Sequence, residues 1–130
     1  MYTQNKNTNT PPQPKLGGNT LLHAVNNYFG PSSGHNFEIG AGGNVLAEGN
    51  VFASVPTPVE DGVEGQLFTA DDGSACSASL GRECVANTLT DSGAFSGTAT
   101  NFLTNFAGKT IASASAASEV DPSNAGFGII

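Results

Sequence analysis

The chain has 130 residues, of which 38% are hydrophobic and 17 are glycine. That length fits one domain, and that apolar fraction can fill a modest core, which excludes wholesale disorder. Four Lys and Arg residues against eleven Asp and Glu residues leave a net charge of −7. Because phosphate contacts need cations, we expect neither nucleic acid nor an anionic membrane as a partner.

Residues 1–14 differ in composition from the rest of the chain. They combine Asn, Thr, Gln and three prolines without apolar periodicity, so we interpret them as a flexible lead-in and residues 15–130 as one domain. No apolar segment of the signal-peptide type follows Met1, and no apolar run approaches the roughly 18 residues of a membrane helix. The sequence therefore predicts neither a signal peptide nor a membrane span in this chain.

Short apolar stretches begin at Leu16 and are separated by clusters of Gly, Asn and Pro, which is typical of strands joined by turns. The stretch 21–29 is repeated at 44–52, a shift of 23 residues that sets Asn27 over Asn50. Repeats of roughly 20 to 50 residues are typical of solenoids, in which each coil buries its apolar side against the next. Asn suits the turns of such a fold because stacked side-chain amides can bond from coil to coil.

A second, less regular echo aligns residues 34–37 with residues 65–68, a shift of 31. It would require extra loop residues in the second turn. An ordinary β-sandwich with chance similarity between strands would produce the same pattern, so the repeats alone leave solenoid and sandwich equally open.

A short amphipathic helix is predicted between Thr100 and Gly108, because Phe102, Leu103 and Phe106 would share one face of it. Thr100, or the residue after it, is a suitable N-cap, and Gly108 is a suitable end. We expect this helix to pack across the flank or the end of the strands.

Two segments follow this helix. Residues 111–118 form an Ala/Ser tract, and residues 122–130 are Gly-rich with apolar side chains near the end. We interpret both as a closing tail that wraps back over the body.

Motifs for catalysis and metal binding are weak. Residues 30–34 have the letters of a nucleophile elbow, but a strand-like stretch follows where a helix is required, so a turn is favoured. His23 and His35 lack Cys or carboxylate partners at zinc spacing, and His23 is better explained as a hydrogen-bonded core residue. The acidic stretches 60–64 and 71–73 lack the ligand pattern of an EF-hand and are interpreted as solvated loops. The sequence predicts no bound metal.

The two cysteines, Cys76 and Cys84, are too few for a cysteine scaffold and match no common zinc knuckle. They could form one small-loop disulfide, which would indicate an oxidising compartment. The compartment stays open on this observation alone.

Several longer runs of sequence are similar to one known family. They are NTLLHAVNNYF (19–29), GHNFEIG (34–40), VLAEGNVF (45–52), CSASLGREC (76–84), FLTNFAGKTIA (102–112) and NAG (124–126). In this order they resemble the C-terminal part of fungal pectin lyases, and the similarity extends from Pro14 to the end of the chain.

The resemblance implies an all-β fold, namely a partial right-handed parallel β-helix (solenoid) with a short C-terminal helix and a closing tail. Residues 15–130 would be the C-terminal part of a pectin lyase-like β-helix domain. Members of that family are secreted and cleave methyl-esterified galacturonan in pectin by β-elimination without calcium. The resemblance therefore implies pectin as the partner, no cofactor, and a monomer for the full-length protein. It also implies a disulfide between Cys76 and Cys84.

The chain departs from the family at one motif. Family members carry Gly-Arg-x-Pro-Lys just before the run at residue 19, and the arginine is held to act in proton abstraction. Here Pro14 and Lys15 fit the motif, but Pro12 occupies the arginine position. Proline offers neither a proton acceptor nor a cation that stabilises enolate-like charge. We expect no catalytic residue in this chain, since the family's catalytic aspartate and second arginine also lie upstream of the matched region.

Lys15 is the one candidate site residue that carries over, as a contact to the substrate carboxylate or its ester. A solvated lysine in the lead-in explains this residue equally well. Two hypotheses for the chain follow: an inactive fragment of a pectin lyase, or a noncatalytic β-solenoid module that binds cell-wall polysaccharide. The net charge of −7 favours nearly neutral esterified pectin over a de-esterified polyanion.

Overall fold

The structure is a computed structural model that describes residues 2–3, 6–7, 15–31 and 35–120. Pro12 and the tail at 122–130 lie outside these ranges, as does most of the run at 30–34. Within the described ranges, no helix is long and apolar enough to cross a membrane.

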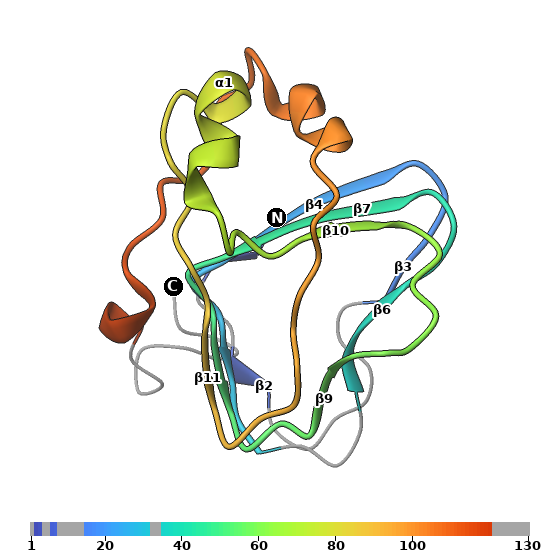
Figure 1. The fold of residues 1–130 in the computed structure, drawn as a ribbon, viewed down its shortest axis with the longest axis vertical. Helices are drawn as coiled ribbons and strands as arrows, with labels where there is room; N and C mark the ends of the chain where they lie inside the picture. The colour runs from blue at the N-terminus through green and yellow to red at the C-terminus, as the bar shows by residue number, and fades with distance from the viewer. Residues whose placement is uncertain (1, 4–5, 8–14, 32–34, 121–130) are drawn as a thin grey trace.

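Eleven short strands in the described residues form three sheets, which the chain visits in turn (Figure 1). Sheet A contains β1 (Tyr2–Thr3), β4 (Thr20–Val25), β7 (Gly43–Glu48) and β10 (Gln66–Phe68). Sheet B contains β2 (Lys6–Asn7), β5 (Tyr28–Phe29), β8 (Val51–Ala53) and β11 (Thr88–Thr90). Sheet C contains β3 (Lys15–Leu16), β6 (His35–Ile39) and β9 (Thr57–Val59).

Neighbouring strands within all three sheets are parallel. Successive strands of one sheet belong to successive coils, with a strand of each other sheet between them in sequence. This arrangement is a partial parallel β-helix, so the solenoid prediction is confirmed. A sandwich of antiparallel strands is excluded.

Of the two repeats found in the sequence, the structure confirms one and contradicts the other. In the pair β4 and β7, Ala24 lies beside Ala47, which confirms the shift of 23 residues. The echo with a shift of 31 is wrong, because His35 pairs with Thr57 in sheet C, whereas β10 pairs with β7 in sheet A. The similarity is thus between strands of two different sheets, each of which buries a phenylalanine.

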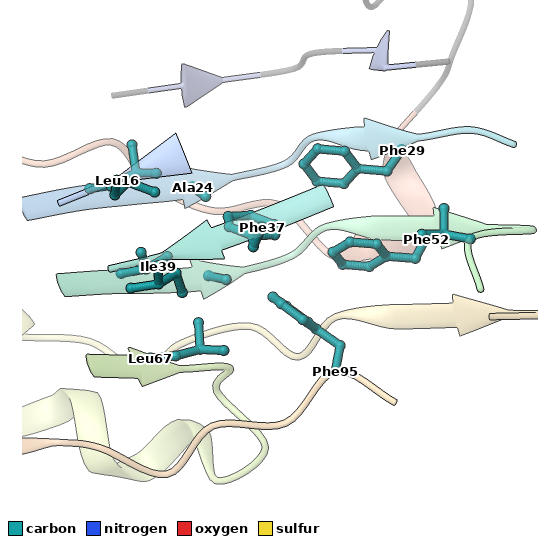
Figure 2. Packing of buried hydrophobic residues seen from close by; sticks show 12 residues of the cluster. Leu16, Ala24, Phe29, Phe37, Ile39, Phe52, Leu67 and Phe95 are labelled. Atoms are coloured by element: carbon teal, nitrogen blue, oxygen red, sulfur yellow. The ribbon is translucent and has the colours of Figure 1, made fainter. Parts of the chain in front are cut away.

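Alternate side chains of the strands fill the interior between the sheets. Four phenylalanines form its centre (Figure 2). The rings of Phe29 and Phe52, one coil apart, are stacked with centroids 4.8 Å apart. Phe37 of sheet C meets the edge of Phe29, with centroids 5.6 Å apart, so aromatic contacts connect sheets B and C.

The turns between sheets A and B carry a ladder of asparagines. The side-chain oxygen of Asn50 accepts hydrogen bonds from the backbone N–H and the side-chain amide of Asn27, at 2.8 and 2.9 Å. The oxygen of Asn87 accepts the equivalent pair from Asn50, both at 2.9 Å. The predicted stacking of Asn27 on Asn50 is therefore confirmed, and the third rung, Asn87, was not predicted.

After β10 the chain leaves the coil and forms an outer layer against sheet A, at the top of Figure 1. This layer contains η1 (Gly73–Cys76), α1 (Ser77–Leu80) and η2 (Asn101–Phe106), followed later by η3 (Ala117–Glu119). The disulfide between Cys76 and Cys84 is present as expected. It joins the layer's second core, in which Leu46 and Phe68 of sheet A pack against η2.

The predicted amphipathic helix is confirmed at η2, with Phe102, Leu103 and Phe106 buried. It is a 3-10 helix, and Thr100 occupies its N-cap position as expected, but the side chain of Thr100 makes no capping hydrogen bond. Burial of the three apolar side chains, rather than capping, stabilises the helix.

The segment between β11 and η2 crosses the open end of the last coil. Phe95 covers the aromatic interior there, with its ring centroid 4.6 Å from that of Phe52. At Gly97 a β-carbon would overlap the carbonyl oxygen of Leu67, so the crossing chain lies directly on the last coil. The C-terminal end of the interior is therefore closed.

Within residues 1–14, which composition indicated to be a flexible lead-in, the structure describes two short strands. Tyr2–Thr3 and Lys6–Asn7 are extended and pair in parallel with β4 and β5. The remaining residues of that stretch are outside the described ranges.

The asparagine ladder yields a stability prediction. Replacement of Asn50 by Ala removes hydrogen-bond partners from both neighbouring rungs, and leaving buried polar groups unpaired costs about 1–3 kcal/mol each. We expect Asn50→Ala to lower the free energy of unfolding by about 3 kcal/mol in denaturant titrations.

Asn44→Ala is the matched control, because Asn44 is only half-buried and its two side-chain hydrogen bonds are 3.3 Å long. This variant should lose less than about 1 kcal/mol. Equal losses in the two variants would contradict the role assigned to the ladder.

Candidate functional site

Sheet C carries the one site residue predicted from sequence that the structure describes. Lys15 lies in β3, where it pairs with Glu38 of β6, and the next residue, Leu16, is buried in the interior. Sheet pairing therefore fixes the backbone of Lys15. Pro12, which the resemblance aligns with the family's arginine, is outside the described residues.

A cleft with a volume of about 290 Å³ lies beside β3 and β6. Its lining includes Leu16, Ile39 and four acidic residues, Glu38, Glu60, Asp61 and Glu64. Two backbone hydrogen bonds hold the 60–64 loop against β6, from Glu60 N–H to the carbonyl of Phe37 and from Glu64 N–H to that of Ile39, at 2.8 and 3.1 Å. The wall of the cleft is therefore fixed to the strand beside Lys15.

The four carboxylates of the lining determine which kind of ligand the cleft can accept. Carboxylates accept hydrogen bonds from hydroxyl groups and repel anions, so the cleft suits a neutral, hydroxyl-rich molecule better than a polyanion. Within the described ranges, no group of three His, Cys, Asp or Glu side chains is arranged to hold a metal ion.

A second polar cluster lies on the outer face of sheet A, beneath the outer layer. Glu48, at the end of β7, has no exposed side-chain area. One of its carboxylate oxygens lies 2.5 Å from Nε2 of His23, which is equally buried. Arg82 donates to both carboxylate oxygens, at 3.0 and 2.9 Å, and the backbone N–H of Val85 donates at 3.0 Å.

These partners keep the buried carboxylate ionised. Burial by itself would raise the pKa of Glu48, but the hydrogen bonds from His23, Arg82 and Val85, together with the charge of Arg82, lower it from 4.5 to about 2. The same pairing raises the pKa of Arg82. Since the carboxylate is charged, Nε2 of His23 carries the proton and donates it.

The pair of His23 and Glu48 is structural and cannot meet a substrate, because neither side chain is exposed. The interpretation of His23 as a hydrogen-bonded core residue is confirmed. Sequence reasoning missed Glu48 and Arg82, which are 34 residues apart. The sequence feature that could have indicated a buried charge is the position of Glu48 directly after the apolar stretch at residues 45–47.

The other acidic loop that the sequence singled out also has a structural role. Asp71 accepts hydrogen bonds from the hydroxyls of Thr69 and Ser96, and Asp72 caps η1 by accepting from the backbone N–H of Ser74. At the serine-containing run of residues 30–34, strand β6 follows rather than a helix, as predicted.

Comparison with known proteins identifies the family. A sequence model of the family described as pectate lyase matches residues 4–129. The chain belongs to this family. The parallel coils and the closed interior described above are thus those of a pectate lyase family domain.

The relatives are fungal proteins. Probable pectin lyase A of Neosartorya fischeri is 58% identical over 123 residues, which are 90% of this chain and 32% of the relative. Pectin lyase B of Emericella nidulans is 59% identical over 121 residues, 88% of this chain and 32% of the relative. Pectin lyase 2 of Aspergillus oryzae is 54% identical over 117 residues, 88% and 31% respectively. The chain spans about a third of the length of these relatives.

The low pKa of Glu48 predicts how stability depends on pH. A folded-state pKa of about 2 against 4.5 in the unfolded chain gives stabilisation that is complete above pH 4.5 and is lost as the pH falls towards 2. The shift corresponds to about 3 kcal/mol. We expect the native chain to exceed Glu48→Gln in unfolding free energy by about that amount at pH 7, and by much less near pH 2.

Urea titrations of both chains at a series of pH values provide the measurement. Every other carboxylate is common to the two chains, so its effect cancels in the difference. A difference that stays constant from pH 7 to pH 2 would show that the charge of Glu48 does not stabilise the fold.

Proposed function

We propose that this chain forms the C-terminal coils of a secreted pectin lyase, whose reaction is β-eliminative cleavage of methyl-esterified galacturonan. The supporting observation is 54–59% identity to three fungal proteins named pectin lyases, over nearly nine tenths of the chain. We further propose that these 130 residues by themselves do not catalyse the reaction.

The reaction removes a proton from C5 of a uronate and expels the 4-linked oxygen. It requires a proton acceptor and a positive charge near the enolate-like intermediate. Pro12, in the family's arginine position, supplies neither group. The nearest described strand downstream, β3, contributes Lys15.

Lys15 is proposed to contact the carboxyl group or methyl ester of the substrate. Its backbone is fixed in sheet C beside Glu38, at the edge of the cleft lined by Glu60 and Asp61. A sugar chain in contact with Lys15 would therefore extend next to carboxylates. A free uronate is repelled there and a methyl ester is not, which supports esterified pectin as the substrate.

A noncatalytic polysaccharide-binding module is the alternative. The coils, the cleft and Lys15 are retained while Pro12 replaces the arginine. A module of this kind binds pectin without cleaving it, so activity and binding have to be measured separately.

A lyase assay tests the first proposal. The purified chain is incubated with highly methylated pectin, and the unsaturated product is followed by its ultraviolet absorbance. We expect no turnover above the background without protein, since Pro12 can neither accept the proton nor stabilise the charge. Sustained product formation that scales with the concentration of the chain would overturn the view that it is inactive.

Retention on immobilised pectin tests the role of Lys15. We expect the chain to be retained on methyl-esterified pectin, and Lys15→Ala to weaken the binding roughly two- to tenfold through loss of one charge-assisted contact. Lys109→Ala, which removes an exposed lysine three residues after η2, is the matched control and should leave retention unchanged.

De-esterified pectin on a second column should retain the chain less than the esterified form. Equal retention of the Lys15→Ala chain and the unaltered chain would remove Lys15 from the site. Retention with no turnover is expected both of an inactive fragment and of a binding module, whereas no retention at any salt concentration would count against the binding-module alternative.

A further inference from the structure

The outer layer over sheet A ends in a long extended segment, residues 107–120, which we call the strap. It runs from η2 to η3 at the left of Figure 1. Within it only Ala117 and Val120 are buried, and Ile111 is half-buried against the outer core. The strap therefore has little apolar contact with the body, in contrast to η2, which buries three large apolar side chains.

Polar contacts hold the strap at two points. At the first, the side-chain amide of Asn26 donates to the carbonyl of Ser115 at 2.8 Å, and the backbone N–H of Ser115 donates back to it at 2.9 Å. At the second, Arg82 donates to the carbonyl of Ala112 at 3.0 Å. A β-carbon at Gly49 would lie 2.9 Å from the carbonyl oxygen of Ser115, so glycine leaves the space that the strap occupies.

Arg82 joins the strap to the body through Glu48. Besides Ala112, its guanidinium bonds both oxygens of that buried carboxylate and the carbonyl of Glu83. A planar guanidinium can make these bonds at once, whereas an ammonium group cannot. The carboxylate in turn is buried and charged, so it strongly favours a conformation in which Arg82 stays in place.

The disulfide closes the loop that carries Arg82. Cys76 and Cys84 close a loop of eight residues' separation with Arg82 two positions before its end. The backbone N–H of Cys84 also bonds the carbonyl of Gly73 at 3.0 Å, which ties the loop's exit to its entry. Directly after the loop, Val85 donates its backbone N–H to Glu48.

We propose that the Cys76–Cys84 loop is a redox-sensitive latch, in which the disulfide holds Arg82 on Glu48 and thereby keeps the strap closed. A dithiol reductant opens the latch: the S–S bond breaks, Cys76 and Cys84 become thiols, and the dithiol is oxidised to its own disulfide. The loop then gains conformational freedom, Arg82 leaves Ala112, and the strap lifts from the turn at Asn26. The coils stay folded, because the asparagine ladder and the phenylalanine interior do not include the loop. This inference does not depend on the proposed function.

Hydrogen exchange followed by NMR at neutral pH tests the latch. Amide exchange is measured in the oxidised 130-residue chain and after treatment with dithiothreitol. We expect the amides of Val85 and Ser115 to exchange at least about tenfold faster after reduction, which corresponds to about 1.4 kcal/mol of lost protection. The amide of Val51, which bonds the carbonyl of Asn27 between coils, should change less than about twofold.

Two variants separate the latch from the other anchor of the strap. Arg82→Lys keeps the positive charge but lacks the planar guanidinium with its several N–H donors. It should therefore accelerate exchange at both Val85 and Ser115 without reductant. Asn26→Gly removes the other anchor and suits the left-handed backbone there, where φ is 55°. It should accelerate exchange at Ser115 and leave Val85 protected.

Three outcomes would overturn the proposal. Unchanged exchange at Ser115 after complete reduction would show that the disulfide does not hold the strap. Equal acceleration at Val51 and Ser115 would show that reduction unfolds the coils as one unit. Unchanged exchange at both sites in Arg82→Lys would show that the guanidinium of Arg82 does not link the strap to Glu48.

Discussion

Registered stacking of coils is the constraint on which the structure depends. Each asparagine of the ladder bonds both the backbone and the side chain of the next, and the ring of Phe29 lies flat on that of Phe52 in the same pair of coils. A slip of one residue between β5 and β8 would break both sets of contacts, since it would turn every side chain to the opposite face. Polar bonds at the turn and apolar packing inside the coil thus specify the same register.

Sheet A differs from the other two sheets because both of its faces are buried. Its inward side chains meet the interior, and its outward ones meet η2 and the disulfide loop. A charged side chain on the outward face must therefore find partners within the protein. Glu48 does so through Arg82, which lies in the segment between β10 and β11 and within the loop that the disulfide closes.

The sequence predicted the features that repeat and missed those that do not. The shift of 23 residues was visible because Asn27 and Asn50 occupy equivalent turns of nearly identical coils. The sequence pattern did not predict Asn87 as a rung of the ladder, because the segment that leaves the coil after β10 places it 37 residues after Asn50. The bond between Glu48 and Arg82 spans 34 residues and follows from where the outer layer folds back, which no local pattern encodes.

The same separation of roles bears on function. Interior side chains and the asparagine ladder hold the coils together, whereas the candidate site lies on the outer edge of sheet C, around Lys15 and the acidic cleft. No rung of the ladder and none of the four interior phenylalanines lines that cleft, although Leu16 and Ile39 of the same core do. The cleft wall and the backbone of Lys15 are held instead by the pairing of β3 with β6 and by the backbone hydrogen bonds of the 60–64 loop to β6.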